Sequence, residues 1–229
     1  RCKHNEAACT TGAAVWGFAR TMRAELAHLR CICVDIEHGM MKRKDWLADV
    51  INTSISLADG DIYEPEIALR NENIYTCRLE RCSSRIKDNL QDAWIDQNKA
   101  YVVTGGLGGL GLLAARHLLN NGAKDISLLS RSGRVPAGSW QLWMDVKRRI
   151  RPDQHLRVVR CDVGSVEGCR RAMRLISSTG HLVGAVLHCA GVLRDMLVDK
   201  MSTADVEAVC EPKVNGSCHM HHHTLGQPG

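Results

Sequence analysis

The residues with the clearest chemical potential form a glycine-rich stretch, TGGLGGLG, at positions 104–111. Gly106, Gly108 and Gly111 fit the G-x-G-x-x-G spacing of dinucleotide-binding loops. Glycine is needed in such a loop because the backbone turns sharply and must come close to a pyrophosphate. The N-terminus of a following helix adds free N–H groups and a positive dipole end. The stretch therefore predicts a dinucleotide site.

The sequence on both sides predicts the strand and the helix that must position this loop. Residues 100–103 read as a short buried strand. After the loop, apolar residues recur at helical spacing until a stop at Gly122, namely Leu112, Leu113, Ala115, Leu118 and Leu119. The alternative is a glycine-rich surface loop, and the flanking elements argue against it.

The residues after the second predicted strand, 125–129, bear on which dinucleotide binds. An acidic residue at this strand end would hold a ribose 2′-hydroxyl and favour NAD. Asp125 instead opens the strand, and Ser130 and Arg131 follow its end. A guanidinium suits bidentate phosphate contact, so Arg131 indicates NADPH. A solvated loop arginine is the alternative interpretation.

Two further strands are predicted at residues 156–159 and 184–187, with an amphipathic helix between them at 166–176. Alternating strands and helices predict an α/β fold with a Rossmann-like, doubly wound parallel sheet. The apolar side of the helix is expected to carry Ala172, Leu175 and Ile176.

Ligands of such a sheet bind at the carboxyl ends of its strands. Asp162 and Val163 follow the third predicted strand, and Cys189, Ala190 and Gly191 follow the fourth. We therefore expect these two segments to line the adenine and the nicotinamide ribose.

Residues 100–229 resemble the first two-thirds of a ketoreductase domain of the short-chain dehydrogenase/reductase superfamily. More narrowly, they resemble the ketoreductases embedded in polyketide synthases and animal-type fatty acid synthases. The segments that carry the resemblance follow in the family's order and spacing: VTGGLGGLG at 103–111, LSRSG at 129–133, CDV at 161–163, HCAGVL at 188–193 and EPKVNG at 211–216.

The resemblance implies an NADPH-dependent reduction of a β-ketoacyl thioester, carried on an acyl carrier protein, to a β-hydroxyacyl thioester. It also implies partner domains in the same synthase, and it makes Lys213 a catalytic residue. The expected cofactor-binding residues are Thr104, Gly105, Gly106, Leu107, Gly108, Gly109, Leu110, Gly111, Ser130, Arg131, Asp162, Val163, Cys189, Ala190 and Gly191.

The upstream region resembles the structural subdomain of megasynthase ketoreductases, a truncated Rossmann-like unit without a glycine loop. Residues 14–25 read as a helix and 30–35 as a strand, while 64–70 resemble a helix end and 74–79 a strand. Free-standing reductases of the superfamily begin within a few residues of the glycine motif, so this region indicates a multidomain setting.

The expected organisation has three parts. Residues 1–84 form a partial structural subdomain, 85–99 form a polar linker, and 100–229 form the NADP-binding Rossmann half. Trp94 and Ile95 are expected to hold the linker against the core.

The chain departs from the family at its catalytic residues. These reductases use a tyrosine as proton donor and a serine to orient the carbonyl. The three tyrosines here, Tyr63, Tyr75 and Tyr101, all precede the helix after the glycine loop. The family's serine and tyrosine would follow Lys213 by several dozen residues, and the sequence ends at Gly229. We therefore expect a C-terminally truncated fragment that is inactive alone.

Three alternatives remain open at this stage. The chain is a free-standing short-chain dehydrogenase, a non-catalytic NADP-binding or structural remnant, or a related epimerase or dehydratase on the same fold. The upstream subdomain disfavours the first alternative, and the absent tyrosine favours the second.

Composition excludes several other classes. No stretch approaches the 18 apolar residues of a membrane span, and the net charge of +5 comes without a basic helix or an aromatic platform for nucleic acid.

The eleven cysteines are odd in number and contain no C-x-x-C pair, which indicates reduced thiols. His219 and His223 share a helical face but lack a third ligand, so no metal site is expected. We expect a cytoplasmic protein, with organelle targeting left open because the sequence does not begin with methionine.

Overall fold

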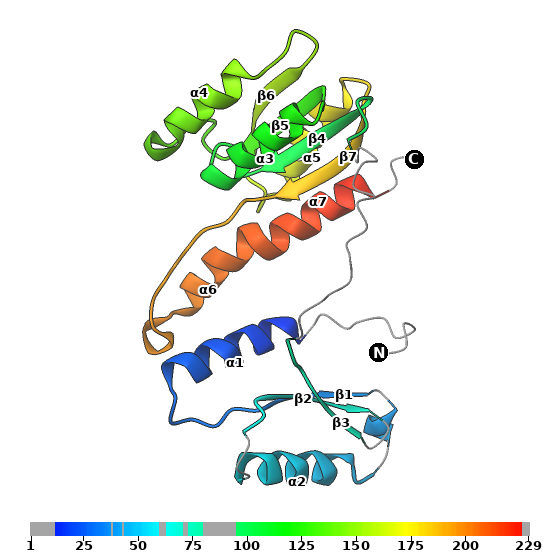
Figure 1. Ribbon diagram of the computed structural model, residues 1–229, viewed down its shortest axis with the longest axis vertical. Coiled ribbons are helices and arrows are strands. Elements are labelled where there is room, and N and C mark those ends of the chain that lie inside the picture. The colour runs from blue at the N-terminus through cyan, green and yellow to red at the C-terminus, as the bar shows by residue number, and fades with distance from the viewer. Residues whose placement is uncertain are drawn as a thin grey trace. The chain divides into compact units, whose positions relative to one another are not determined.

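The computed structural model describes residues 12–37, 39–42, 44–59, 63–70, 73–79 and 95–225. Contacts divide the chain into two compact units (Figure 1). The first unit comprises Arg1–Ser84 with Met196–Lys200, and the second comprises Arg85–Asp195 with Met201–Gly229. The three-part division at residues 84 and 99 stays a prediction, and the sequence did not indicate that 196–200 join the first unit.

The second unit contains a four-stranded parallel sheet in the order β6-β5-β4-β7. Its strands are β4 (Lys99–Thr104), β5 (Asp125–Ser130), β6 (His155–Arg160) and β7 (Leu182–His188). All four predicted strands are confirmed, with bounds one to three residues wider. The chain places β5 and β6 on one side of β4 and then returns to place β7 on the other side. This reversal makes the β4–β7 boundary the point where a doubly wound sheet binds its ligand.

Helices cover both faces of this sheet. Helices α3 (Gly109–Asn120) and α4 (Trp140–Arg148) pack on one face, and α5 (Val166–Ser177) and α7 (Gly216–Thr224) pack on the other. Helix α6 (Thr203–Cys210) has no buried residue. Short 3₁₀ turns lie at Ala137–Ser139 in this unit and at Val198–Lys200 in the first unit. A π-helical turn, Glu211–Asn215, joins α6 to α7, and the three form one continuous rod, orange to red in Figure 1.

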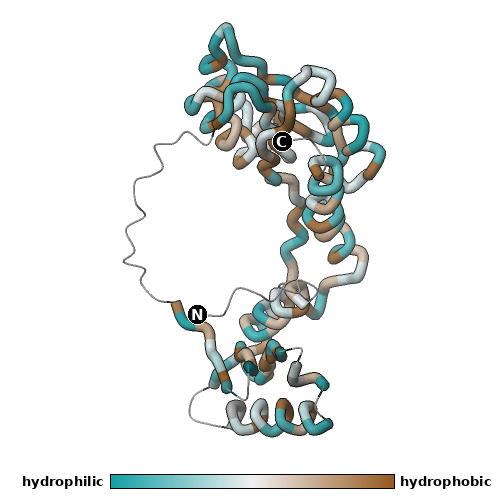
Figure 2. Tube along the Cα trace, turned by 90° about the vertical axis from the view of Figure 1, so that its right-hand side faces the viewer, coloured by the Kyte–Doolittle hydropathy of each residue, from teal (hydrophilic) through white to brown (hydrophobic). Residues whose placement is uncertain are grey.

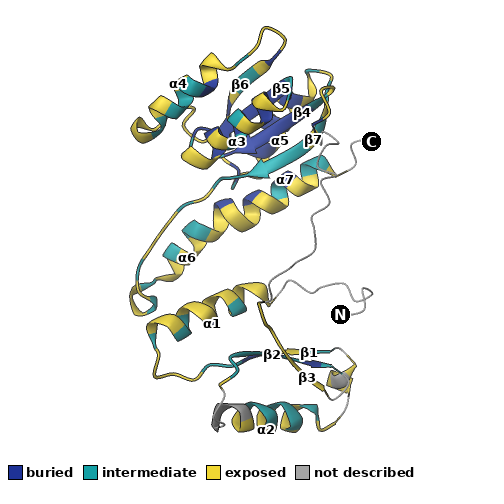
Figure 3. Ribbon diagram, viewed as in Figure 1, coloured by how far each residue is buried: buried dark blue, intermediate teal, exposed yellow. Residues whose placement is uncertain are grey.

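Two hydrophobic cores lie on opposite faces of the sheet. Side chains alternate along a strand, so Tyr101 and Val103 face α3 and α4, while Ala100 and Val102 face α5 and α7. Strands β4 and β5 are accordingly buried almost throughout (Figure 3). This arrangement confirms the predicted Rossmann-like fold class.

The helix faces differ in detail from the prediction. Leu175 is 54% exposed, so placing it on the apolar side of the helix was wrong, and Leu113 in α3 is 41% exposed. In α5, Cys169 and Met173 are buried instead, in one cluster with Ala100, Val102 and Val159 of the sheet. Ile95 is buried in the first core as expected, and Trp94 lies outside the described residues.

The first unit has a three-stranded sheet in the order β1-β2-β3. Strands β1 (Cys33–Ile36) and β2 (Glu66–Arg70) are parallel, and β3 (Asn73–Thr76) is antiparallel to β2. A parallel pair needs a crossover, which is supplied by a 3₁₀ turn (Met40–Lys42) and helix α2 (Trp46–Asp59), a helix that the sequence analysis missed.

Two expectations for the first unit have definite outcomes. The predicted helix at 14–25 is confirmed as α1 (Ala13–Glu25). The helix end predicted at 64–70 is wrong, because this segment is strand β2. Its period-two pattern buries Ile67 and Leu69 on one face, which is the alternation of a half-buried strand.

The core of the first unit is small. Ile67 and Leu69 form its buried centre, with Ile32, Val34, Ile36 and Val50 packed against them. Helix α2 mixes hydrophobic and hydrophilic residues along its length (Figure 2), and its Leu47, Ile51 and Ile55 remain about half exposed. No helix in the described ranges is long and apolar enough to cross a membrane.

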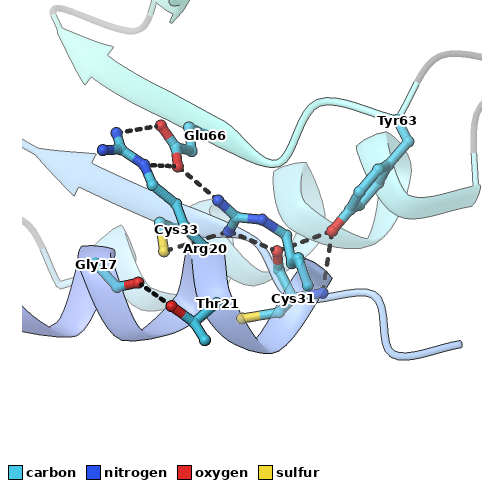
Figure 4. Close-up of polar contacts among 8 residues, drawn as sticks. Gly17, Arg20, Thr21, Cys31, Cys33, Tyr63 and Glu66 are labelled. Carbon is cyan, nitrogen blue, oxygen red and sulfur yellow. Dashed lines mark hydrogen bonds and ion pairs between the residues drawn. The ribbon is translucent and has the colours of Figure 1, made fainter. Parts of the chain in front are cut away.

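Ion pairs and hydrogen bonds hold α1 to the sheet of the first unit (Figure 4). Arg20 donates two hydrogen bonds to the Glu66 carboxylate at 2.7 and 2.8 Å, and Arg23 donates another at 2.5 Å. These contacts, those from Arg20 first, hold the pKa of Glu66 below its usual value. The Tyr63 hydroxyl binds both backbone groups of Cys31, so this tyrosine has a structural role.

Candidate functional site

The glycine loop lies between the end of β4 and the start of α3, as predicted. Gly105 has a φ of +61°, in the left-handed region that favours glycine. A Cβ at Gly105 would lie 2.7 Å from the carbonyl oxygen of Cys189, at the end of β7. The loop can therefore pass this close to the β7 strand end only with glycine at that position.

The Thr104 side chain connects the ends of β4 and β7. Its hydroxyl oxygen accepts hydrogen bonds from the backbone N–H groups of Cys189 and Ala190, both at 3.1 Å. Thr104 is fully buried, so it acts beneath the site rather than in its lining. The two strand ends that should carry the cofactor are thus held to each other by a side chain.

A cavity of about 350 Å³ opens at the carboxyl ends of all four strands of the second unit. This volume lies within the range of small-molecule and cofactor sites. Predicted cofactor residues in its lining are Gly105, Leu107, Gly108, Ser130, Arg131, Val163, Cys189, Ala190 and Gly191. Segments separated by more than 80 residues therefore meet around one cavity, and a glycine-lined loop there fits a dinucleotide.

Several predicted residues lie outside this lining. They are Thr104, Gly106, Gly109, Leu110, Gly111 and Asp162. Gly106 and Gly111 are packed against neighbouring backbone, and Leu110 is 73% exposed. The Asp162 carboxylate accepts a hydrogen bond from the backbone N–H of Gly164 at 3.1 Å, so it organises the turn after β6.

The structure also brings to the cavity residues that the sequence analysis missed, namely Leu129, Ser132, Arg134, Pro136, Cys161, Val192 and Pro212. The sequence could have indicated Arg134 as a cavity residue, because it lies in the same polar turn as Arg131. Gly133, between them, has a φ of +67°, and Arg160 donates a hydrogen bond to the Arg131 carbonyl at 3.1 Å. Among the described residues that line the cavity two are arginines and none is acidic, which favours an anionic ligand.

Lys213 lies beside the end of β7. Its Cε is 3.4 Å from the position that a Cβ on Gly191 would take, so the side chain runs across this glycine. The Ser217 hydroxyl donates to the Lys213 carbonyl, and the Lys213 side chain itself is exposed. The exposed ammonium group is therefore within reach of the segment expected to hold the nicotinamide ribose.

The side chains of Tyr101 and His219 make hydrogen bonds to the backbone that stabilise the fold. The Tyr101 hydroxyl bonds to both backbone groups of Asp96, and burial raises the pKa of this tyrosine. His219 Nδ1 lies 2.9 Å from the Val163 carbonyl oxygen, which holds α7 to the turn after β6. Within the described ranges, no three metal-ligating side chains form a group.

Two cysteine thiols in the cavity wall should react slowly. Burial raises the pKa of Cys161 and of Cys189, and the thiolate is the reactive form. At pH 7 we expect iodoacetamide to label the exposed Cys77, Cys210 and Cys218 before either of them. Because both pKa values are raised, labelling should accelerate by about tenfold per pH unit above pH 7. Peptide mass spectrometry measures this order, and early labelling of Cys189 at pH 7 would contradict it.

Comparison with known proteins agrees with this geometry. Residues 99–228 match the family model described as the KR domain. The chain is 29% identical over 220 residues to a phenolphthiocerol/phthiocerol polyketide synthase polypeptide of Mycobacterium tuberculosis (strain CDC 1551 / Oshkosh), covering 96% of the chain and 11% of that relative. It is 27% identical over 213 residues to the chalcone synthase cfoA of Aspergillus candidus, covering 91% of the chain and 7% of that relative. The chain thus spans only a small part of these curated relatives.

Solved structures show the same relationship. The first ketoreductase of the tylosin PKS aligns with a TM-score of 0.72 and 27% identity, over 99% of this chain and 45% of that one. An A-type ketoreductase from a modular polyketide synthase aligns with a TM-score of 0.80 and 20% identity, over 98% and 46% of the two chains, and shows a shared fold. Because the family model covers more than half of the residues, the chain belongs to the ketoreductase (KR) domain family.

Proposed function

We propose that this chain forms the NADPH-binding half of a β-ketoacyl reductase in a polyketide or fatty acid synthase. One observation carries the proposal. The cavity at the strand ends combines the glycine loop, Arg131 and Arg134, and Lys213 lies across Gly191 at its β7 side. Residues 1–84 serve as a structural subdomain, 85–99 as the linker and 100–229 as the NADP-binding part.

The substrate is a β-ketoacyl thioester on an acyl carrier protein, and the product is the β-hydroxyacyl thioester. A bound nicotinamide supplies the hydride that reduces the ketone carbon. The free N–H groups at the start of α3 bind the pyrophosphate, and the Cys189–Gly191 segment positions the nicotinamide ribose. Lys213 provides positive charge at that ribose and assists the proton transfer that neutralises the alkoxide.

Arg131 is the basis for choosing NADPH over NADH. It follows the end of β5, where an acidic residue would bind a ribose 2′-hydroxyl, and it lines the cavity together with Arg134. A guanidinium forms strong, charge-assisted hydrogen bonds with phosphate. Two such groups on one turn therefore favour a ribose that carries a 2′-phosphate.

The substitution Arg131→Asp should weaken NADPH binding. It removes a charge-assisted contact worth about 1.5–3 kcal/mol, which corresponds to roughly a tenfold to hundredfold loss of affinity. NADH has no 2′-phosphate, so its affinity should change far less. Fluorescence titration of the chain with each cofactor measures both values. Arg148→Asp, an equal charge change at an exposed arginine of α4, is the matched control. Equal NADPH affinity in the Arg131→Asp variant and the parent would reject the assignment.

The proposed reaction is tested on the natural protein that carries this chain. A β-ketoacyl thioester of pantetheine, free or on a carrier protein, is incubated with NADPH or NADH, and oxidation of the cofactor is followed by absorbance. We expect faster turnover with NADPH, with the β-hydroxyacyl thioester identified by mass spectrometry. Tight NADPH binding without reduction would instead establish the non-catalytic alternative.

A further inference from the structure

One histidine links the glycine loop, the end of β7 and the segment that carries Lys213. His188 is the last residue of β7. Its Nδ1 lies 2.9 Å from the Thr104 hydroxyl, and its Nε2 lies 3.0 Å from the backbone carbonyl oxygen of Pro212. The ring therefore spans from the strand beside the glycine loop to the residue that precedes Lys213.

The partners of the ring determine which nitrogen carries the proton. The Thr104 oxygen already accepts two backbone N–H groups, from Cys189 and Ala190. A hydroxyl has two acceptor sites and one proton, so Thr104 can only donate to His188 Nδ1. Nδ1 must then be unprotonated, and the proton of the neutral ring must be on Nε2. That N–H donates to the Pro212 carbonyl, which can only accept.

The carbonyl that receives this hydrogen bond belongs to an unusual helical turn. Pro212 lies in the π-helical turn Glu211–Asn215, and proline has no N–H with which to continue a regular helix. Such π turns are uncommon and occur frequently at functional sites. The His188 ring also packs tightly here, because a Cβ on Gly216 would lie 3.2 Å from its Cε1. The turn is thus held in place by both a hydrogen bond and contact with the ring.

The same turn presents Lys213 to the cofactor segment. The Lys213 side chain crosses Gly191, and Gly191 follows His188 by three residues. The contact of the ring with Pro212 therefore links the position of Lys213 to that of Cys189–Gly191. The Thr104 hydroxyl holds that segment by accepting hydrogen bonds from the backbone N–H groups of Cys189 and Ala190. A shift of about 1 Å at such a position can change a rate by about a hundredfold.

We propose that His188, in its Nε2–H tautomer, is a positioning residue that acts through Lys213. This inference rests on the proposed function, in which Lys213 assists the reaction. His188 itself is not among the residues that line the cavity at the strand ends. Its ring fixes the position of the turn that carries the lysine relative to the ends of β4 and β7.

The main test is a double-mutant cycle in the natural protein that carries this chain. We expect His188→Phe to lower kcat by roughly tenfold to hundredfold with less than about a twofold change in the KM for NADPH. In a Lys213→Ala background the same substitution should change kcat by less than about twofold, because the residue through which it acts is gone. His188→Gln keeps an N–H donor for the Pro212 carbonyl and should restore most of the activity. His155→Phe, at an exposed histidine of β6, is the matched control.

A second measurement does not depend on turnover. Nitrogen-15 NMR of the histidine side chains in this chain should show His188 protonated at Nε2 and unprotonated at Nδ1. Hydrogen exchange should become faster in residues 211–216 of His188→Phe, remain unchanged in β4 and β5, and recover in His188→Gln. These readouts distinguish a local positioning effect from a loss of the fold.

The outcomes separate this inference from the proposed function. Full kcat in Lys213→Ala would reject the catalytic role of the lysine and the positioning role together. A lowered kcat in Lys213→Ala, with an equal further loss from His188→Phe, would reject only the positioning role. An Nδ1–H tautomer, or no rescue by His188→Gln, would also overturn the inference.

Discussion

Lys213→Ala is expected to lower the turnover of ketone reduction by about 10²–10⁴-fold in the natural protein that carries this chain. The ammonium group stands at the end of an exposed side chain that crosses Gly191, so its removal takes positive charge away from the β7 side of the cavity, where the nicotinamide ribose is expected. Few packing contacts are lost with an exposed lysine, and the thermal midpoint should hardly change. Steady-state kinetics and thermal unfolding measure the two effects.

Two further variants test whether the ammonium group of Lys213 itself is required. Lys213→Arg keeps the charge but not the compact, rotatable ammonium group, and should recover only part of the lost turnover. Lys124→Ala removes a lysine next to the amino end of β5, away from the cavity, and should leave turnover unchanged. Near-normal turnover in Lys213→Ala would identify it as an ordinary surface lysine.

Gly108→Val is expected to lower the affinity of the chain for NADPH by at least about a hundredfold while leaving the fold largely intact. Gly108 lines the cavity just before α3, and the helix N-terminus behind it is the expected pyrophosphate site. A Cβ at this position would lie 3.3 Å from the Gly105 carbonyl oxygen, a contact that a small shift relieves. The valine methyl groups would then compete with the phosphate for space.

Gly106→Val should behave differently, although the sequence pattern treats both glycines alike. A Cβ at Gly106 would lie 2.6 Å from Leu128 Cβ and 2.8 Å from Leu128 Cα, inside the core. Overpacking of this kind costs about 1–3 kcal/mol. The structure therefore gives Gly106 a packing role against β5, and its close approach to the pyrophosphate stays a prediction.

Thermal unfolding with and without NADPH distinguishes the two variants. Gly108→Val should keep the midpoint of the free protein and lose the stabilisation that NADPH provides, whereas Gly106→Val should unfold at a lower temperature under both conditions. Gly138→Val adds the same side chain where no atom lies within 4 Å and serves as the control. Undiminished NADPH protection of Gly108→Val would show that the loop has only a structural role.

Local features of the second unit could be predicted from the sequence because they depend on short-range patterns. The strand before the glycine loop, the helix after it and the stop at Gly122 follow from apolar spacing and from the backbone conformations open to glycine. The order of strands and helices was enough to place the ligand site at the strand ends. The same reasoning failed in the first unit, where a short segment ending at Arg70 was assigned to a helix and proved to be strand β2.

Contacts between distant segments were decided only by the tertiary structure. The sequence determined that this chain has a glycine loop between a strand and a helix, an arginine after the second strand of the Rossmann half and the family's lysine segment. It did not show that the Thr104 hydroxyl accepts a hydrogen bond from the Ala190 N–H, or that the His188 ring hydrogen-bonds to the Pro212 carbonyl. Nor did it show that the Lys213 side chain crosses Gly191. These pairs meet because β7 returns to the far side of β4 and because the π turn brings its backbone down onto the end of β7. Strand order and helix docking arise from packing across the whole sheet, which short-range spacing does not encode.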